Sequence, residues 1–421
     1  MEKLNKRISI IFGVIVAIFI CLALGNSHIE TLNHQDHVIF RSGDDFMADY
    51  FNVQRYISER DPYYNEINTR SEHGYLPLSY LLILPLNNVC DYAHMSLEDC
   101  WHTPMALYTA LLFLLISLFF FFDSLYRLNN KKGWKIYNTF LLLFTSLFLF
   151  SIERGNEIFI SAAGINYFLA YYDTESKWKR IFALFCLCFA AVLKVYPVLF
   201  GILLLQDKRY KDIAFCVVTG LILTFVPFFF FKHGLSSIPH IFENIHIHTE
   251  TYSTPSTEYQ FGIHALCKEI TYAIYYLHPD SISDHSANLV NTFAQVTSAL
   301  LALISLVLAF FERRRWLQLG LIAMVIMVYP FHSIFYCALY LLPMMILFLS
   351  KEECTKIDYV IAGLLVVIMN PIQFVVEPIS LTPVIANICT IILWILFIVY
   401  SGKGLYEKRK NALKVKAVNN K

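Results

Sequence analysis

The residues with the clearest chemical potential begin with a group of acids in the segment 43–50, GDDFMADY. Asp45 and Asp49 are four residues apart, so their carboxylates share one face if this segment is helical. A carboxylate just outside a membrane, beside an apolar cavity, suits a general base because partial loss of water tunes its pKa. The alternatives are a solvated acidic loop, or a divalent metal held by Asp44 and Asp45, for which two adjacent carboxylates are weak evidence.

Arg154 and Lys194 are the basic residues that could bind a phosphate. Each lies between two apolar runs, in the sequences ERGN (153–156) and KVYP (194–197). Two cations at the ends of short helices, with Asn156 adjacent to one of them, suit a phosphate that stays attached to a lipid. The alternative is that both long side chains reach toward lipid headgroups.

His332 lies in a third turn between apolar runs, YPFHS (329–333), and could donate a hydrogen bond to a phosphate or contact a sugar hydroxyl. A structural role is the alternative for a single histidine. The spacing of His240, His246 and His248 is not specific for zinc, since no cysteine or carboxylate pattern accompanies it. The sequence has no glycine-rich phosphate loop, nucleophile elbow or CxxC pair, and we expect no metal and no cofactor.

The elements that must position these residues are apolar helices. Hydrophobic residues make up 57% of the 421 positions and charged residues 15%, whereas soluble domains have about 45–50% and 25%. The excess is concentrated in blocks that are typical of membrane spans. The apolar runs are 8–25, 105–126, 136–152, 158–172, 181–193, 195–206, 212–231, 287–310, 316–330, 334–350, 357–375 and 383–401.

The positions of the basic residues predict the topology. With the N-terminus in the cytoplasm, all but eight of the 33 Lys and Arg residues fall in inner loops or termini, which is a strong positive-inside bias. The segments 26–104 and 232–286 are then exported loops, and 402–421 is a cytoplasmic tail of one membrane domain, 1–421. Residues 8–25 could be a signal peptide, but the run is long and favours an uncleaved first helix.

The same bias divides two longer apolar stretches. Reading 181–206 as one helix would bury Lys194 at a cost of roughly 3 kcal/mol, and would export the basic cluster at 313–315. Two short spans with a break at 194–197 avoid both problems, and 136–172 similarly divides at 153–156. Residues 75–86 are apolar but too short to cross, so we expect an interfacial or re-entrant helix there.

The order of several short motifs resembles glycosyltransferase family 87 (GT87), membrane enzymes of the GT-C fold that use polyprenyl-phosphate donors. The motifs in the first exported segment are 45–50 (DFMADY), 60–63 (RDPY) and 75–78 (YLPL), and the turns 154–156 (RGN) and 194–197 (KVYP) resemble two later ones. Asp49 stands where the family commonly has Tyr, and the region around His332 matches loosely. The resemblance covers roughly residues 10–350.

The resemblance implies an all-α polytopic membrane protein, a GT-C-like bundle of about 12 transmembrane helices with a long first exported loop. It implies that Asp45 deprotonates an acceptor hydroxyl, which attacks the anomeric carbon of a lipid-phosphate sugar with inversion. Arg154 and Lys194, supported by His332, would bind the donor phosphate and stabilise the charge that develops on it. Five residues would make the other substrate contacts: Asp44, Asp49, Tyr75, Asn156 and Tyr196.

The resemblance also implies the substrates and the location. The donor would be a polyprenyl-phosphate carrying a mannose-like hexose or a pentose, and the acceptor a glycolipid or glycan. A phosphate already attached to lipid needs no nucleotide-binding domain, and the chain shows none. A net charge of +1 gives no indication of a nucleic-acid partner. The expected site faces outward from a bacterial cytoplasmic membrane, among membrane lipids.

Three other functions are compatible with these residues. A transporter or flippase for lipid-linked sugars would explain cations within the membrane, but it predicts repeated helix halves, which the sequence lacks. An O-antigen ligase or polymerase-type enzyme would use Arg and His residues of the later exported loop, 232–286. A non-catalytic assembly factor would keep the fold without activity, and the Asp at position 49 mildly favours it.

Overall fold

A computed structural model describes residues 14, 46–57, 61–64, 74–128, 145–251, 260–278, 283–330, 334–351, 355–370, 375–376 and 379–419. The chain divides into two compact units. We call Val16–Leu204 with Arg209–Thr257 the N-terminal unit, and Met1–Ile15 with Leu205–Lys208 and Glu258–Lys421 the C-terminal unit. The expectation of one membrane domain over 1–421 stays a prediction.

The described part of the N-terminal unit is helical, with η marking a 3-10 helix. Its elements are α2 (Ala48–Ile57), α3 (Pro77–Asn87), η2 (Tyr92–His94), α4 (Leu97–His102), α5 (Pro104–Leu128), α7 (Ser146–Arg154), α8 (Ile158–Tyr171), α9 (Lys177–Lys194), η3 (Tyr196–Gly201), α10 (Ile202–Gln206, whose last two residues belong to the C-terminal unit), α11 (Tyr210–Phe225), η4 (Val226–Phe230), η5 (Gly234–Ser237) and α12 (Ile238–Thr251).

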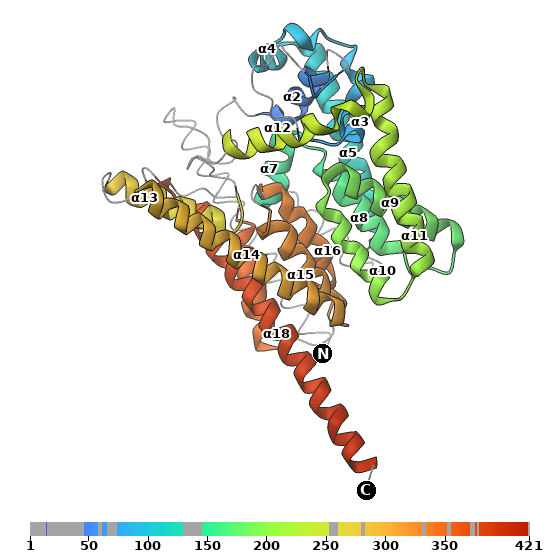
Figure 1. Cartoon of the computed structure of the whole chain (residues 1–421), viewed down its shortest axis with the longest axis vertical. Helices are drawn as coiled ribbons and strands as arrows, with labels where there is room; N and C mark the ends of the chain where they lie inside the picture. Colours follow the sequence, from blue (N-terminus) through green and yellow to red (C-terminus); the bar gives the residue numbers. More distant parts are fainter. Residues whose placement is uncertain are drawn as a thin grey trace. The chain divides into compact units, whose positions relative to one another are not determined.

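Helix α8 forms the core of the N-terminal unit. It packs against both α5 and α9, and α11 packs against α9 (Figure 1). Nearly every residue of α8 from 158 to 168 is buried, which agrees with an apolar sequence on all faces of the helix. Small residues allow the neighbours to come close: a Cβ added at Gly164 would lie 2.9 Å from the backbone oxygen of Cys186 in α9.

Both predicted helix breaks of the N-terminal unit are confirmed. Helix α7 ends at Arg154, and Gly155 follows in the left-handed conformation, with φ of 63°, before α8 begins. Helix α9 ends at Lys194, and Val195, with φ of 43°, separates it from η3. A single helix over 181–206 is therefore not formed, and both cations that the sequence singled out are the last residues of their helices.

The described part of the C-terminal unit consists of helices and one minimal hairpin. Its elements are α13 (Ile263–Leu277), α14 (Asp284–Phe311), α15 (Arg315–Val328), η6 (Phe335–Leu341), α16 (Leu342–Leu349), α17 (Lys356–Ile368), β1 (Val375–Val376), β2 (Ile379–Ser380) and α18 (Leu381–Asn419). The strands are antiparallel, with Val375 opposite Ser380 and Val376 opposite Ile379.

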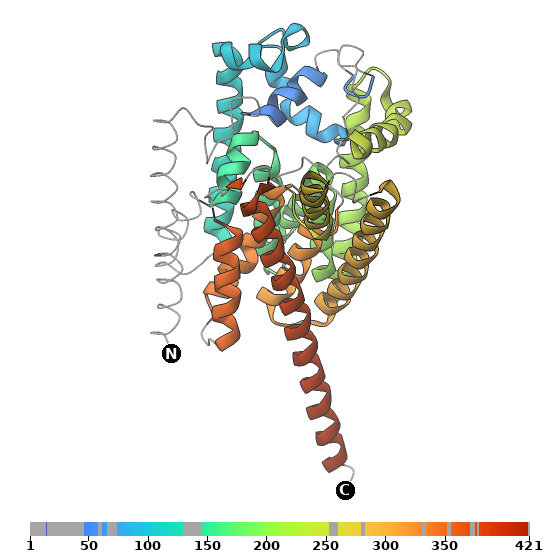
Figure 2. The same ribbon diagram turned by 90° about the vertical axis from the view of Figure 1, so that its left-hand side faces the viewer.

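Helix α15 occupies the centre of the C-terminal unit. All of its residues from 316 to 328 are buried, and it packs against α14, α16, α18 and η6. Helix α18 instead continues past its neighbours, and its C-terminal part extends beyond the other helices of the unit (Figure 2). The predicted tail at 402–421 therefore begins inside a helix that is continuous to Asn419.

Among the described residues, four helical segments are long and apolar enough to cross a membrane: Pro104–Leu128, Tyr210–Phe230, His285–Phe311 and Leu381–Ala412. The other apolar helices are shorter; α8, with 14 residues, reaches about 21 Å at 1.5 Å per residue, against a hydrocarbon core of about 30 Å. The expected count of about 12 crossings is therefore not established. Apart from Val14, the first predicted span, 8–25, lies outside the described residues, and the predicted sidedness stays a prediction.

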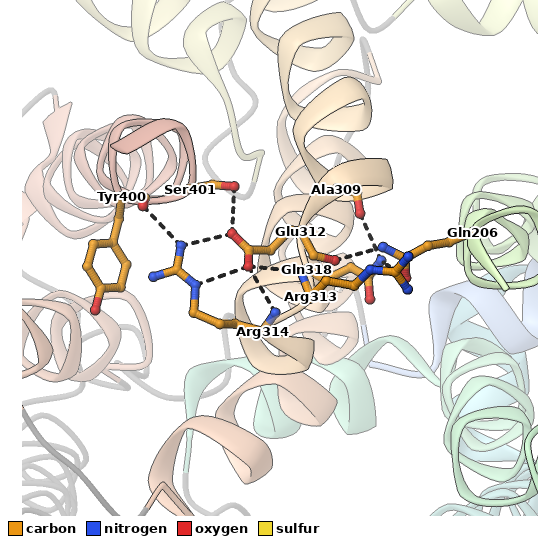
Figure 3. A network of polar contacts seen from close by, with 8 residues as sticks. All are labelled: Gln206, Ala309, Glu312, Arg313, Arg314, Gln318, Tyr400 and Ser401. Carbon is orange, nitrogen blue, oxygen red and sulfur yellow. Dashed lines mark hydrogen bonds and ion pairs between the residues drawn. The ribbon is translucent and has the colours of Figure 1, made fainter. Parts of the chain in front are cut away.

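A buried carboxylate joins three parts of the C-terminal unit at the turn between α14 and α15 (Figure 3). Glu312 accepts hydrogen bonds from the backbone and side chain of Arg314, at 2.9–3.0 Å, and from the Ser401 hydroxyl in α18, at 2.8 Å. The backbone oxygen of Glu312 accepts a bond of 2.8 Å from Gln206. Gln206 in turn accepts a bond from Gln318, at 2.9 Å. The network thus connects α15, α18 and the end of α10.

The pKa of Glu312 follows from this surrounding. Burial by itself would raise the pKa, but the hydrogen bonds from Arg314 and Ser401 outweigh it and hold the pKa below the ordinary value of a glutamate. Because the pKa is lower in the folded than in the unfolded chain, the resulting stabilisation is present at neutral pH. It is lost as the pH falls through the pKa of the folded state.

We expect Glu312→Gln to lower the free energy of unfolding by about 1.5 to 3 kcal/mol, which is the contribution of hydrogen bonds to charged groups. The Arg314 side chain is 33% exposed. Solvent therefore screens its charge, and the effect should lie toward the lower end of this range. The measurement is unfolding of the detergent-solubilised protein followed by tryptophan fluorescence, and the difference from the wild type should shrink on acidification. Glu407→Gln, an identical change at an exposed position of α18, is the control and should have no measurable effect.

Candidate functional site

The chain is fixed to the first helix break just before α2. The Trp101 side chain donates a hydrogen bond of 2.6 Å to the backbone oxygen of Phe46, and the backbone N–H of Met47 donates one of 2.5 Å to the oxygen of Glu153. Met47 has a positive φ of 55°, and α2 begins one residue later at Ala48. A helix therefore does not run through Met47. Asp45 lies outside the described residues, so its expected position beside Asp49 stays a prediction.

Asp49, in the first turn of α2, contacts two of the residues predicted at this break. Its Oδ1 accepts hydrogen bonds from Arg154 Nε, at 3.1 Å, and Nη2, at 2.5 Å. Its Oδ2 accepts one of 2.7 Å from Asn156 Nδ2. Asn156 is itself oriented, because its Oδ1 accepts the backbone N–H of Ile158 at 3.0 Å. The Arg154 and Asp49 side chains are 20% and 12% exposed, so this ion pair can be reached from solvent.

Tyr75, just before α3, connects this ion pair to the second helix break. Its hydroxyl accepts a hydrogen bond of 3.4 Å from Asn156, and the Lys194 ammonium lies 4.4 Å from the centre of its ring. Lys194 also lies 3.4 Å from Glu157, and both side chains are almost fully buried, at 6% and 5% exposure. The Ser79 hydroxyl of α3 donates a hydrogen bond of 2.9 Å to the same Glu157 oxygen.

Glu157 follows the first helix break directly, and its pKa is raised. Burial is the main cause, because it penalises the charged form, and the ammonium of Lys194 and the hydroxyl of Ser79 oppose it. Lys194 at the end of a short apolar helix needed a nearby negative charge. That requirement is the signal in the sequence that points to Glu157, which lies one residue beyond the predicted turn at 153–156.

Five of the nine predicted site residues form one contact network: Asp49, Tyr75, Arg154, Asn156 and Lys194. Tyr196 lies two residues beyond Lys194, at the start of η3, and is half-buried. Asp44, Asp45 and His332 lie outside the described residues. The network, with Glu157 added, places two cations beside two carboxylates, so the cations are held in position by fixed charges. Such an arrangement is preorganised to interact with an anion without rearrangement of long side chains.

No group of three or more His, Cys, Asp or Glu side chains in the described ranges is placed to hold a metal ion. The chain matches the family model of glycosyltransferase family 87 over residues 74–331, which is more than half of its length. The matched range contains Tyr75, Arg154, Asn156 and Lys194, and it begins after Asp49. No curated protein and no solved structure matches the chain.

The left-handed turn at Gly155 can be tested by substitution. A Cβ at this position would lie 2.5 Å from the Met47 sulfur and 3.2 Å from Tyr50 Cβ. We therefore expect Gly155→Ala to cost at least about 1–2 kcal/mol of stability, the penalty for the left-handed conformation alone. Thermal unfolding measures this cost. Gly220→Ala is the control, since an added Cβ there meets nothing within 4 Å and alanine favours a helix. Equal stability of the two variants would contradict the left-handed conformation of Gly155.

The buried pair of Lys194 and Glu157 predicts non-additive substitutions. Lys194→Met leaves the Glu157 carboxylate buried without its cation, and Glu157→Gln does the converse, so each should cost about 3–5 kcal/mol. The double variant should cost clearly less than the sum. A double-mutant cycle of unfolding free energies measures the coupling. Strictly additive losses would show that the two side chains do not stabilise each other.

Proposed function

Because the chain belongs to glycosyltransferase family 87, which indicates glycosyltransferase activity, we propose that it is an inverting enzyme with a lipid-linked donor. The donor is a polyprenyl-phosphate carrying a mannose-like hexose or a pentose, and the acceptor is a glycolipid or glycan. The family and the apolar helices suggest a membrane protein. We place the reaction on the outer side of a bacterial cytoplasmic membrane, in a bundle of about twelve crossings.

The observation that supports this proposal is the contact network at the two helix breaks, which we call the cation network. It consists of Arg154 and Lys194 with Asp49, Tyr75, Asn156 and Glu157. Breaking the bond between sugar and phosphate converts a phosphodiester with one negative charge into a monoester with more. A fixed cation beside that phosphate therefore binds the transition state more strongly than the ground state. The partly exposed Arg154 suits direct contact with phosphate oxygens, because a guanidinium presents five N–H donors in a planar fork. Lys194 is buried behind the Tyr75 ring and would act on the phosphate through the electric field of its charge.

The general base in this proposal is Asp45. It directly precedes Phe46, whose backbone oxygen accepts a hydrogen bond from the Trp101 side chain. The next residue, Met47, donates its backbone N–H to Glu153, beside Arg154. Asp45 removes the proton of the acceptor hydroxyl, whose oxygen bonds to the anomeric carbon as the bond from that carbon to the phosphate oxygen breaks. The lipid phosphate leaves with the electron pair. Attack opposite the leaving group inverts the anomeric centre.

The remaining predicted residues have supporting roles in the proposal. Asp49 does not suit proton transfer, because both of its carboxylate oxygens already accept hydrogen bonds; it holds Arg154 in place. Asp44, Tyr75, Asn156 and Tyr196 contact the substrates, and His332 assists in binding the donor phosphate. No metal ion, cofactor or nucleic acid takes part, and the lipid tail of the donor lies among membrane lipids.

Substitution of the proposed base tests the mechanism. The protein in lipid nanodiscs would be given a synthetic polyprenyl-phosphate mannose and membrane extract as acceptor. We expect Asp45→Asn to lower the transfer rate by about 10²–10⁴, the contribution of a general base, while donor binding stays within about twofold.

Asp91→Asn is the matched control, since this acid belongs to the same predicted exported loop and its side chain is 73% exposed. Near-normal transfer by Asp45→Asn would refute the assignment of the base. Arg154→Ala should instead weaken donor binding, and unchanged binding in that variant would refute the phosphate site.

A further inference from the structure

A second group of polar side chains in the N-terminal unit joins the RDPY motif to η5. Asp61 is 4% exposed, and its Oδ2 accepts hydrogen bonds from His233 at both the backbone N–H (3.1 Å) and ring Nδ1 (2.5 Å). Its Oδ1 accepts the backbone N–H of Tyr63 at 3.3 Å. The residues of this pair are 172 positions apart in the sequence, so the contact joins the two segments that were predicted to be exported.

The Asp61 contact determines which ring nitrogen of His233 can meet a ligand. The contact occupies Nδ1, because a carboxylate accepts hydrogen bonds and a ring N–H donates them. Nε2 is therefore the nitrogen that faces a ligand, and in the tautomer with its proton on Nδ1 it is an acceptor. The His233 side chain is 35% exposed. A carboxylate orients an imidazole in the same way in metal sites and in Ser-His-Asp triads, where the opposite nitrogen contacts the metal or the nucleophile.

The Tyr64 ring contacts two imidazoles. Its centre lies 4.0 Å from that of His233 and 4.2 Å from that of His240. Tyr64 is held by its hydroxyl, which donates to the backbone oxygen of Ser236 at 3.4 Å. His240 is 39% exposed, and its Nδ1 lies 3.3 Å from Glu243. Three rings therefore lie close together, and Nε2 of His233 is the ring nitrogen that the Asp61 contact leaves for a ligand.

The group is connected to the cation network by one side chain. The Tyr63 hydroxyl donates a hydrogen bond of 2.8 Å to the backbone oxygen of Tyr75, and Tyr75 contacts both Asn156 and Lys194. Tyr63, which lies between Asp61 and Tyr64 in the sequence, thus connects this group to the proposed donor site.

The chemistry of the group favours a neutral ligand that donates hydrogen bonds. Asp61 and Glu243 place negative charge beside the two imidazoles, which opposes the binding of a phosphate. The four His, Asp and Glu side chains of this group are not placed to hold a metal ion, since no such group of three or more occurs among the described residues. Sugars satisfy the remaining requirements, since their hydroxyls donate hydrogen bonds and the apolar faces of their rings pack on aromatic side chains.

We propose that His233, Tyr64 and His240 bind a sugar ring of the acceptor, with a sugar hydroxyl donating to His233 Nε2 and Asp61 acting as the positioning residue. The inference rests on the proposed function, because it assigns the acceptor to a site of its own beside the donor. Binding can nevertheless be measured without donor or transfer, so the two proposals can fail separately.

The test is a saturation-transfer NMR titration of the protein in nanodiscs with the methyl α-glycosides of mannose, glucose and galactose. The informative variant is His233→Asn, whose amide nitrogen replaces Nδ1 and keeps the bond to Asp61 while nothing replaces Nε2. We expect His233→Asn to bind the preferred glycoside about five- to tenfold more weakly than the wild type, the effect of one lost hydrogen bond. His233→Ala should bind at least as weakly.

His94→Asn is the matched control, because His94 also contacts an aspartate through Nδ1, at 2.9 Å from Asp91, but is 79% exposed; it should bind like the wild type. The unfolding temperature of each variant shows whether the fold is retained. Wild-type affinity in His233→Asn, with loss only in His233→Ala, would overturn the proposal by showing that His233 merely fixes Asp61. A wild-type protein that binds none of the three glycosides would overturn it as well.

Discussion

The site depends on the neutralisation of charges at helix ends inside a largely apolar protein. Arg154 and Lys194 are the last residues of α7 and α9, and each lies against a carboxylate, Asp49 and Glu157 respectively. A buried charge without a partner is so costly that the fold must bring an acid to each cation. Asp49 comes from a helix 105 positions before Arg154 and joins α2 to the end of α7. Glu157, in the turn before α8, joins that turn to the end of α9.

Backbone conformation makes these pairings geometrically possible. Gly155 turns the chain sharply after α7 in a conformation that side chains disfavour, and Met47 approaches this turn closely enough to form a backbone hydrogen bond with Glu153. Small residues of α8 let α9 come near, and Lys194 at the end of α9 lies over the Tyr75 ring. The result is a set of cations positioned before any substrate arrives, which is the property that stabilisation of a developing phosphate charge requires.

Carboxylates perform the same structural task in three places. Glu312 joins α15 to α18 in the C-terminal unit, Asp49 joins α2 to the turn before α8, and Asp61 joins the RDPY motif to η5. In each case the acid accepts several hydrogen bonds, and at least one of them comes from a segment that is distant in the sequence. On the surface, water would compete for these hydrogen bonds. Partial burial excludes much of this water and strengthens the bonds. At Asp49 and Asp61 the same geometry also orients a side chain that can meet a ligand.

The sequence by itself determined the apolar helices, their breaks and the cations at those breaks. Hydrophobic run length and the cost of a central Lys194 are local properties, so they could be read without a structure. Only the tertiary structure decided the partners: Glu157 for Lys194, Asp49 for Arg154 and His233 for Asp61. Pairing between distant segments depends on packing and on single residues such as Met47, whose positive φ precedes the start of α2. No periodicity in the sequence encodes such contacts, because they arise only when separate helices meet.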